Sequence, residues 1–96
     1  MRIRWKKDRA FQSANRAETA RVGGYELTAF DLPAGNGSPR IVGWELYGGR
    51  DLLDLLRKGE SADFAAAKQD AEAAYRAVRS AVASTRKTLR HGGGAR

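Results

Sequence analysis

Two stretches in the middle of the chain alternate between apolar and polar residues. Tyr25 to Leu32 alternates in this way, is rich in strand-forming residues and follows Gly23-Gly24. Arg40 to Tyr47 reads as a second strand, after a segment dense in Pro, Gly, Asn and Ser. The pattern predicts two antiparallel strands joined by an exposed hairpin loop.

The segment from Leu52 to Lys58 fits either a helix or a strand. In a helix, Asp51 would cap the start, Arg57 and Lys58 would lie in the last turn, and Gly59 would end it. A two-stranded hairpin is a poor platform for a helix, however, so a third strand is needed next to the first two. We therefore predict a strand here.

Apolar residues recur at steps of three and four from Ser61 onward, which is typical of a helix. They are Phe64, Ala67, Ala71, Ala74, Tyr75, Val78, Val82 and Leu89. Ser61 or Asp63 can cap this helix, which we expect to extend to about Arg90. Thirty helical residues span about 45 Å, whereas an eight-residue strand spans about 27 Å. The last turns should therefore extend beyond the sheet.

Because strand side chains alternate between faces, the three predicted strands sort into two faces. The face expected under the helix comprises Tyr25, Leu27, Ala29, Val42, Trp44, Leu46, Leu53 and Leu55. The opposite face comprises Glu26, Thr28, Phe30, Ile41, Gly43, Glu45, Tyr47, Leu52, Asp54 and Leu56. Its apolar members make a candidate protein-binding surface, formed by Phe30, Ile41, Tyr47, Leu52 and Leu56. The acidic members of this face would repel phosphates, which argues against base stacking there.

Together these elements predict an α+β fold: a three-stranded antiparallel β-meander packed against one long C-terminal α-helix. We assign residues 22–90 to this βββα domain, residues 1–21 to a basic N-terminal extension, and residues 91–96 to a flexible tail. Residues 10–20 could form a short helix. Trp5 and Phe11 either pack onto the domain edge, or Trp5 stacks bases within a phosphate-binding arm.

Charge is concentrated at the two ends of the 96-residue chain, which has a formal net charge of +7. Residues 1–22 carry seven cations and two acids, and residues 80–96 carry four cations and no acid. The candidate phosphate-binding residues are Arg2, Arg4, Lys6, Lys7, Arg9, Arg79, Arg86, Lys87 and Arg90. We expect a basic binding module that engages nucleic acid or a nucleoprotein complex through phosphate contacts. Cations that merely keep a small protein soluble are the alternative explanation.

The residue types that most often perform catalysis are sparse in this sequence. Cysteine is absent, and the single histidine, His91, lies in the Gly-rich tail. We therefore expect no enzymatic activity, no metal, no cofactor and no small-molecule substrate. No apolar run approaches the ~20 residues of a membrane span, and none follows the N-terminal cations as in a secretory signal. We expect a cytoplasmic protein with no membrane contact.

Short motifs between residues 22 and 78 resemble small uncharacterised proteins of bacteria, phages and prophages with a three-strand-then-helix core. These motifs are Gly24-Tyr25-x-Leu27, Trp44, Gly59-x-Ser61, Ala66-Ala67-Lys68 and Ala71-Glu72-Ala73-Ala74. The order also resembles the second half of a double-stranded-RNA-binding domain, in which Gly-x-Ser leads into a helix with phosphate-gripping lysines. Here Ala62 and Asp63 follow Ser61.

Some phage proteins of this size and topology inhibit bacterial defence complexes, anti-CRISPR proteins among them. This resemblance implies an alternative function, in which the chain binds and inhibits a protein partner. A third alternative is a structural subunit or homodimer that self-associates through the exposed sheet face.

Overall fold

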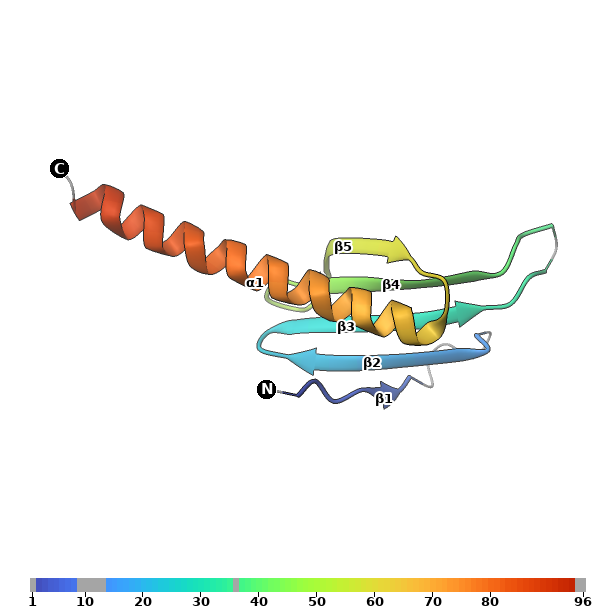
Figure 1. The fold of residues 1–96 in the computed structure, drawn as a ribbon. Coiled ribbons are helices and arrows are strands. Elements are labelled where there is room, and N and C mark those ends of the chain that lie inside the picture. Colours follow the sequence, from blue (N-terminus) through green and yellow to red (C-terminus); the bar gives the residue numbers. More distant parts are fainter. Residues whose placement is uncertain (1, 9–13, 36, 95–96) are drawn as a thin grey trace.

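The computed structural model describes residues 2–8, 14–35 and 37–94, with side chains described up to residue 83. The described residues form β1 (Lys6–Lys7), β2 (Arg16–Val22), β3 (Tyr25–Leu32), β4 (Ile41–Gly48), β5 (Asp54–Glu60) and α1 (Phe64–Gly94). The strands make one sheet in the order β1-β2-β3-β4-β5, and every neighbouring pair is antiparallel. Helix α1 crosses one face of this sheet (Figure 1), so the predicted α+β class is confirmed.

The prediction of three strands is wrong, because the segment assigned to an N-terminal extension contributes β1 and β2. The chain turns from β2 to β3 through Gly23 and Gly24, whose φ angles are +52° and +83°. The backbone twist of such a two-residue turn matches the twist of the two strands that it joins, so Val22 pairs directly with Tyr25. The short helix considered for residues 10–20 is also wrong from Arg16 onward, where pairing with β3 overrides the helix propensity of Ala, Glu and Arg. Residues 10–13 lie outside the described part.

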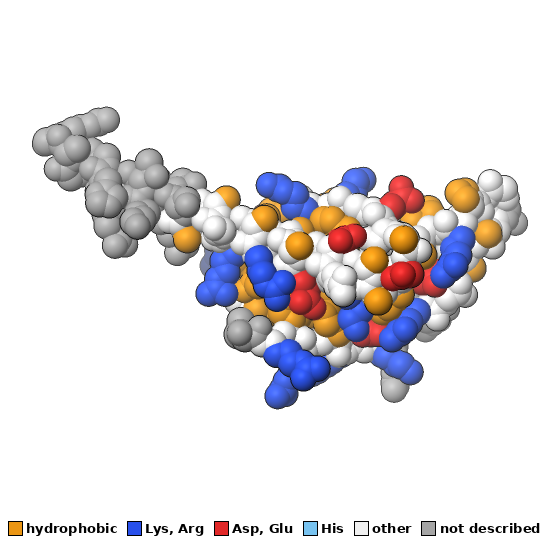
Figure 2. Space-filling view, viewed as in Figure 1, with side chains coloured by type: hydrophobic (Ala, Val, Ile, Leu, Met, Phe, Trp, Pro, Cys, Tyr) orange, Lys and Arg blue, Asp and Glu red, His pale blue; other side chains and the backbone are white. Residues whose placement is uncertain are grey.

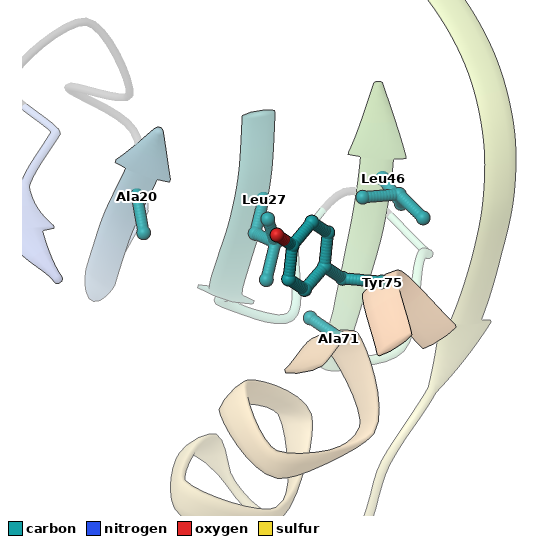
Figure 3. Close-up of a cluster of buried hydrophobic side chains, with 5 residues drawn as sticks. All are labelled: Ala20, Leu27, Leu46, Ala71 and Tyr75. Atoms are coloured by element: carbon teal, nitrogen blue, oxygen red, sulfur yellow. The ribbon is translucent and has the colours of Figure 1, made fainter. Parts of the chain in front are cut away.

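The core forms where α1 packs on β3 and β4. The side chains it covers are those that the alternating pattern of these two strands predicted to lie under the helix. Leu27 and Leu46 are fully buried beneath Ala71 and Tyr75 (Figure 3). A second cluster joins Ala29 and Val42 to Phe64 and Ala67, with Trp44 packed against both clusters. Alanines on the buried side of α1 permit close approach of the helix to the sheet. The Tyr75 ring meets the Tyr25 ring edge-on, with centroids 5.4 Å apart.

Two glycines within the strands are covered by the aromatic rings of their cross-strand partners. Gly59 pairs with Trp44, and a Cβ atom at Gly59 would lie 2.9 Å from Trp44 Nε1. Gly43 pairs with Phe30, and a Cβ atom at Gly43 would lie 2.6 Å from the Gly59 carbonyl oxygen. The rings occupy the space that strand side chains would fill, so these positions require glycine.

The predicted third strand is confirmed as β5, but the faces assigned to its leucines are wrong. A β-bulge lies between Leu46 and Tyr47, which pair with Arg57 and Leu55 respectively. Leu56 is therefore the additional residue, and it turns towards the helix to pack against the buried cluster. Leu55, expected under the helix, is instead 46% exposed, and Leu53 before the strand is 78% exposed. A one-residue change of register exchanges the two faces of a strand.

Helix α1 begins as predicted, with Asp63 as its cap: the Ala66 N–H donates to Asp63 Oδ1 at 2.8 Å. Val78 still packs against the core, whereas Val82 is 38% exposed, and Figure 1 shows α1 continuing past the sheet. The predicted overhang is therefore confirmed. The helix ends at Gly94, so residues 91–94 of the expected tail are helical. None of the described helical residues forms a stretch long and apolar enough to cross a bilayer.

Candidate nucleic-acid interface

A groove of about 890 Å³ runs between the N-terminal segment and α1. Its lining residues are Arg2, Ile3, Arg4, Trp5, Lys6, Glu18, Lys68, Glu72 and Arg76. Five of these residues are cations and two are carboxylates, which leaves a net charge of +3. The groove thus combines cations of the N-terminal segment with two cations of α1, Lys68 and Arg76.

The N-terminal segment is held against α1 by its alternate residues. Ile3 and Trp5 pack against the core, and the Trp5 indole N–H donates to Glu72 Oε2 at 2.8 Å. Arg4 and Lys6, which alternate with them, are exposed. Trp5 therefore anchors the segment to the domain edge, the first of the two roles considered for it, and its ring does not stand free for base stacking.

The two carboxylates in the groove are already engaged by neighbouring cations. Glu18 accepts from Lys68 Nζ at 2.9 Å and from Arg16 at 3.0 Å. Burial of Glu18 raises its pKa, but its hydrogen bonds and attraction to Lys68 and Arg16 outweigh this and hold the pKa below its ordinary value. Glu72 accepts from Arg76 at 3.3 Å as well as from Trp5. These two carboxylates therefore pair with Arg16, Lys68 and Arg76. The other groove cations, Arg2, Arg4 and Lys6, have no carboxylate partner among the described residues.

Four predicted cations of the N-terminal segment make no ion pair with any described residue. They are Arg2, Arg4, Lys6 and Lys7. Arg79, one turn beyond Tyr75, donates to the Tyr75 hydroxyl at 2.9 Å and lines an adjoining hollow of about 380 Å³. This hollow shares Ile3 and Arg76 with the groove, so the basic surface continues along α1. Figure 2 shows Lys and Arg side chains gathered beside the helix and along the sheet edge beneath it.

The structure brings together most of the predicted phosphate-binding residues that it describes. Arg2, Arg4, Lys6 and Arg79 line the two connected hollows, and Lys7 lies exposed on the adjoining edge strand β1. Arg9 and the side chains of Arg86, Lys87 and Arg90 lie outside the described residues.

Two groove cations, Lys68 and Arg76, were not among the predicted site residues. The sequence does carry a signal for them, because they flank Glu72 at four-residue spacing on one side of the helix. What the sequence did not reveal is that the N-terminal segment lies against this side.

Elsewhere on the sheet, Arg21 and Arg40 are paired with carboxylates, whereas Arg50, Arg57 and Lys58 near its β5 edge make no ion pair with a described residue. Arg40 makes two hydrogen bonds to the Asp31 carboxylate, at 2.8 and 2.6 Å, and Arg21 pairs with Glu26 at 3.0 Å. The bond from Arg40 holds the pKa of Asp31 below its ordinary value. Arg21 and Arg40 thus cross-link neighbouring strands or hairpin ends, so their charge is partly neutralised within the fold.

The residues predicted to form one protein-binding surface are dispersed. Phe30 and Ile41 line a hollow of about 420 Å³, whereas Tyr47 and Leu52 line a separate hollow of about 320 Å³. Leu56 is a correction, since the β-bulge turns it to the helix side of the sheet. No single apolar patch made of these five residues therefore exists on the open face.

Comparisons with known proteins identify no relative of this chain. No family model matches the chain, and neither a curated protein nor a solved structure matches it. Within the described residues, no three histidine or carboxylate side chains lie close enough together to hold a metal ion.

Proposed function

We propose that the protein binds nucleic acid through phosphate contacts in the groove between its N-terminal segment and α1. The observation that supports this function is the set of groove-side cations without a carboxylate partner among the described residues. They are Arg2, Arg4, Lys6, Lys7 and Arg79. Phosphate groups are the ligands that such a row of guanidinium and ammonium groups fits.

The groove is suited to the phosphate backbone rather than to bases. Its one tryptophan is anchored by Glu72 and covered by Lys68, whose Nζ lies 5.5 Å from the ring centroid. Contacts to phosphates fix position without reading sequence, so the proposed binding is sequence-independent. We further propose a cytoplasmic protein that acts as a non-enzymatic module, either on free nucleic acid or on a nucleoprotein complex.

Two triple variants of equal net charge test the location of the site. Arg2→Gln/Arg4→Gln/Lys6→Gln removes three groove cations. Arg50→Gln/Arg57→Gln/Lys58→Gln removes three exposed cations at the opposite, β5 edge of the sheet. Each variant lowers the formal charge from +7 to +4. Fluorescence anisotropy with a labelled 20-nucleotide DNA, single-stranded or duplex, compares their affinities with that of the unmodified protein.

The groove variant should lose most of the affinity, while the β5-edge variant should retain nearly all of it. Equal losses in the two variants would mean that net charge alone attracts the DNA, and the proposed interface would then be wrong. Circular dichroism melting of both variants verifies that the fold is intact.

A second candidate function, binding of a protein partner, is favoured by two exposed leucines. Leu53, just before β5, is 78% exposed, and Leu55, within β5, is 46% exposed. Large apolar side chains grouped at a sheet edge are typical of contact surfaces. If this edge supports self-association, Leu53→Ser/Leu55→Ser lowers the mass measured by light scattering at high protein concentration. A protein that is monomeric at every concentration would speak against the homodimer.

A further inference from the structure

The outer side of β5 has no neighbouring strand among the described residues (Figure 1). The Ser61 N–H donates to the Val42 carbonyl oxygen at 2.9 Å, so these two opposed residues form a hydrogen-bonded pair that continues the β4–β5 register. Hydrogen-bonded and non-hydrogen-bonded pairs alternate along an antiparallel ladder. The backbone N–H and C=O groups of Glu60 and Lys58, one and three residues before Ser61, therefore point away from β4 and towards the outer edge.

The side chains of Lys58 and Glu60 carry opposite charges and lie on the same face of the sheet, two residues apart. Both are exposed, and neither makes an ion pair with a described residue. Glu45, opposite Lys58 on β4, accepts from the Tyr47 hydroxyl at 2.8 Å instead. The edge thus presents open backbone groups together with one cation and one carboxylate that the described part of the fold leaves unpaired.

Gly59 lies between these two charged residues. An antiparallel strand of the same sequence, centred on Gly59, would place its own Gly59 directly opposite, in a pair of the kind that brings Cα atoms to about 4.5 Å. Glycine keeps this closest approach of the two backbones free of side chains. The sequence Lys58-Gly59-Glu60 then sets Lys58 against Glu60 of the other strand, and Glu60 against its Lys58.

We propose that β5 pairs with β5 of a second copy of this chain, antiparallel and centred on Gly59. Lys58 and Glu60 of the second copy exchange two backbone hydrogen bonds, and their side chains form an ion pair. Glu60 and Lys58 of the second copy make the same contacts, as a two-fold axis requires. This pairing gives the second candidate function a specific partner, and it rests on that function in requiring an accessible β5 edge.

Charge complementarity favours this register over its neighbours. Registers that oppose Lys58 to Lys58, or Glu60 to Glu60, set like charges directly against each other, which destabilises a sheet. The bulge at Leu56 interrupts the regular edge, so the new ladder is confined to residues 57–61. Such a short contact is weak, with an expected Kd on the order of 0.1 mM. The groove lies beside β1 at the other edge of the sheet, so the pairing leaves it uncovered.

Two variants with exchanged charges test this register on the full chain. Lys58→Glu leaves two carboxylates at the edge and Glu60→Lys leaves two ammonium groups, so each variant alone meets like charges in the proposed pairing. Each should weaken self-association at least about tenfold. An equimolar mixture restores both opposite-charge pairs and should associate within about threefold of the affinity of the unmodified protein. Sedimentation equilibrium from one tenth to ten times the expected Kd measures these affinities.

Arg50→Glu and Asp51→Lys are the matched controls, because they make the same two charge changes at exposed residues of the turn before β5. Alone and mixed, they should associate like the unmodified protein. When isotope-labelled Lys58→Glu is titrated with unlabelled Glu60→Lys, the NMR amide signals of residues 57–61 should shift and those of β1 and β2 should not. Circular dichroism melting verifies that all four variants are folded.

An unmodified protein that is monomeric at ten times the expected Kd overturns the proposed pairing. So does a mixture of Lys58→Glu and Glu60→Lys that associates no better than its two components. Equal behaviour of the edge variants and the controls also overturns it, since total charge alone would then govern the attraction. None of these results bears on DNA binding in the groove or on capture of a different protein by Leu53 and Leu55, which are measured separately.

Discussion

Removal of the three N-terminal groove cations should change the salt dependence of DNA binding by a definite amount. Each phosphate contact on duplex DNA contributes about −0.9 to the slope of log K against log salt concentration. Five described cations beside the groove lack a carboxylate partner, so their contribution to the slope is about −4.5. Between 50 and 200 mM salt, such a slope corresponds to about 500-fold weaker binding.

In Arg2→Gln/Arg4→Gln/Lys6→Gln two of these contacts remain. The expected contribution falls to about −1.8, which corresponds to about 12-fold weakening over the same salt range. Contacts made by residues outside the described part contribute the same amount to the slope in every variant. The quantity tested is therefore the difference of about 2.7 between the two slopes.

Fluorescence anisotropy at four or more salt concentrations measures both slopes, with Arg50→Gln/Arg57→Gln/Lys58→Gln as the control of equal charge. The control should keep the slope of the unmodified protein. A groove variant and control with the same slope would refute the assignment of phosphate contacts to this surface. A slope near zero for the unmodified protein would refute phosphate binding altogether.

Three further predictions concern the fold that holds the groove. Gly43→Ala should lower the free energy of unfolding by about 1–3 kcal/mol, because its Cβ would meet backbone 2.6 Å away; an unchanged urea midpoint would contradict this. Trp5→Phe, which removes the N–H bound to Glu72, should cost about 1 kcal/mol in the same assay, and no change would mean that the bond contributes nothing. Glu18 and Asp31 have lowered pKa values in the folded state, so the stability they contribute is present at neutral pH and is lost as the pH falls below about 4. Thermal melts at pH 7 and pH 3 should show this loss reduced in Glu18→Gln/Asp31→Asn, and equal acid sensitivity would contradict the assignment.

The sequence by itself determined the elements whose signals are local. The alternation from Tyr25 to Leu32, the three- and four-residue spacing after Ser61, and the cap at Asp63 depend only on neighbouring residues. Because one face of β3 and β4 must be buried, their side-chain pattern also specified which face α1 covers. The overhang of α1 followed from the lengths of the elements alone.

Tertiary structure decided the features that depend on pairing between distant residues. β2 is a strand because the turn at Gly23 and Gly24 returns the chain along β3, although its own composition also suits a helix. The register of β5 depends on a bulge against β4, which reversed the expected positions of its leucines.

The candidate sites depend on such pairings most of all. Trp5 meets Glu72 across 67 residues of sequence, and this contact lays the N-terminal cations beside those of α1. Charge and composition can be read along a chain, but which charges become neighbours is determined by long-range packing, for which a single sequence carries no local signal.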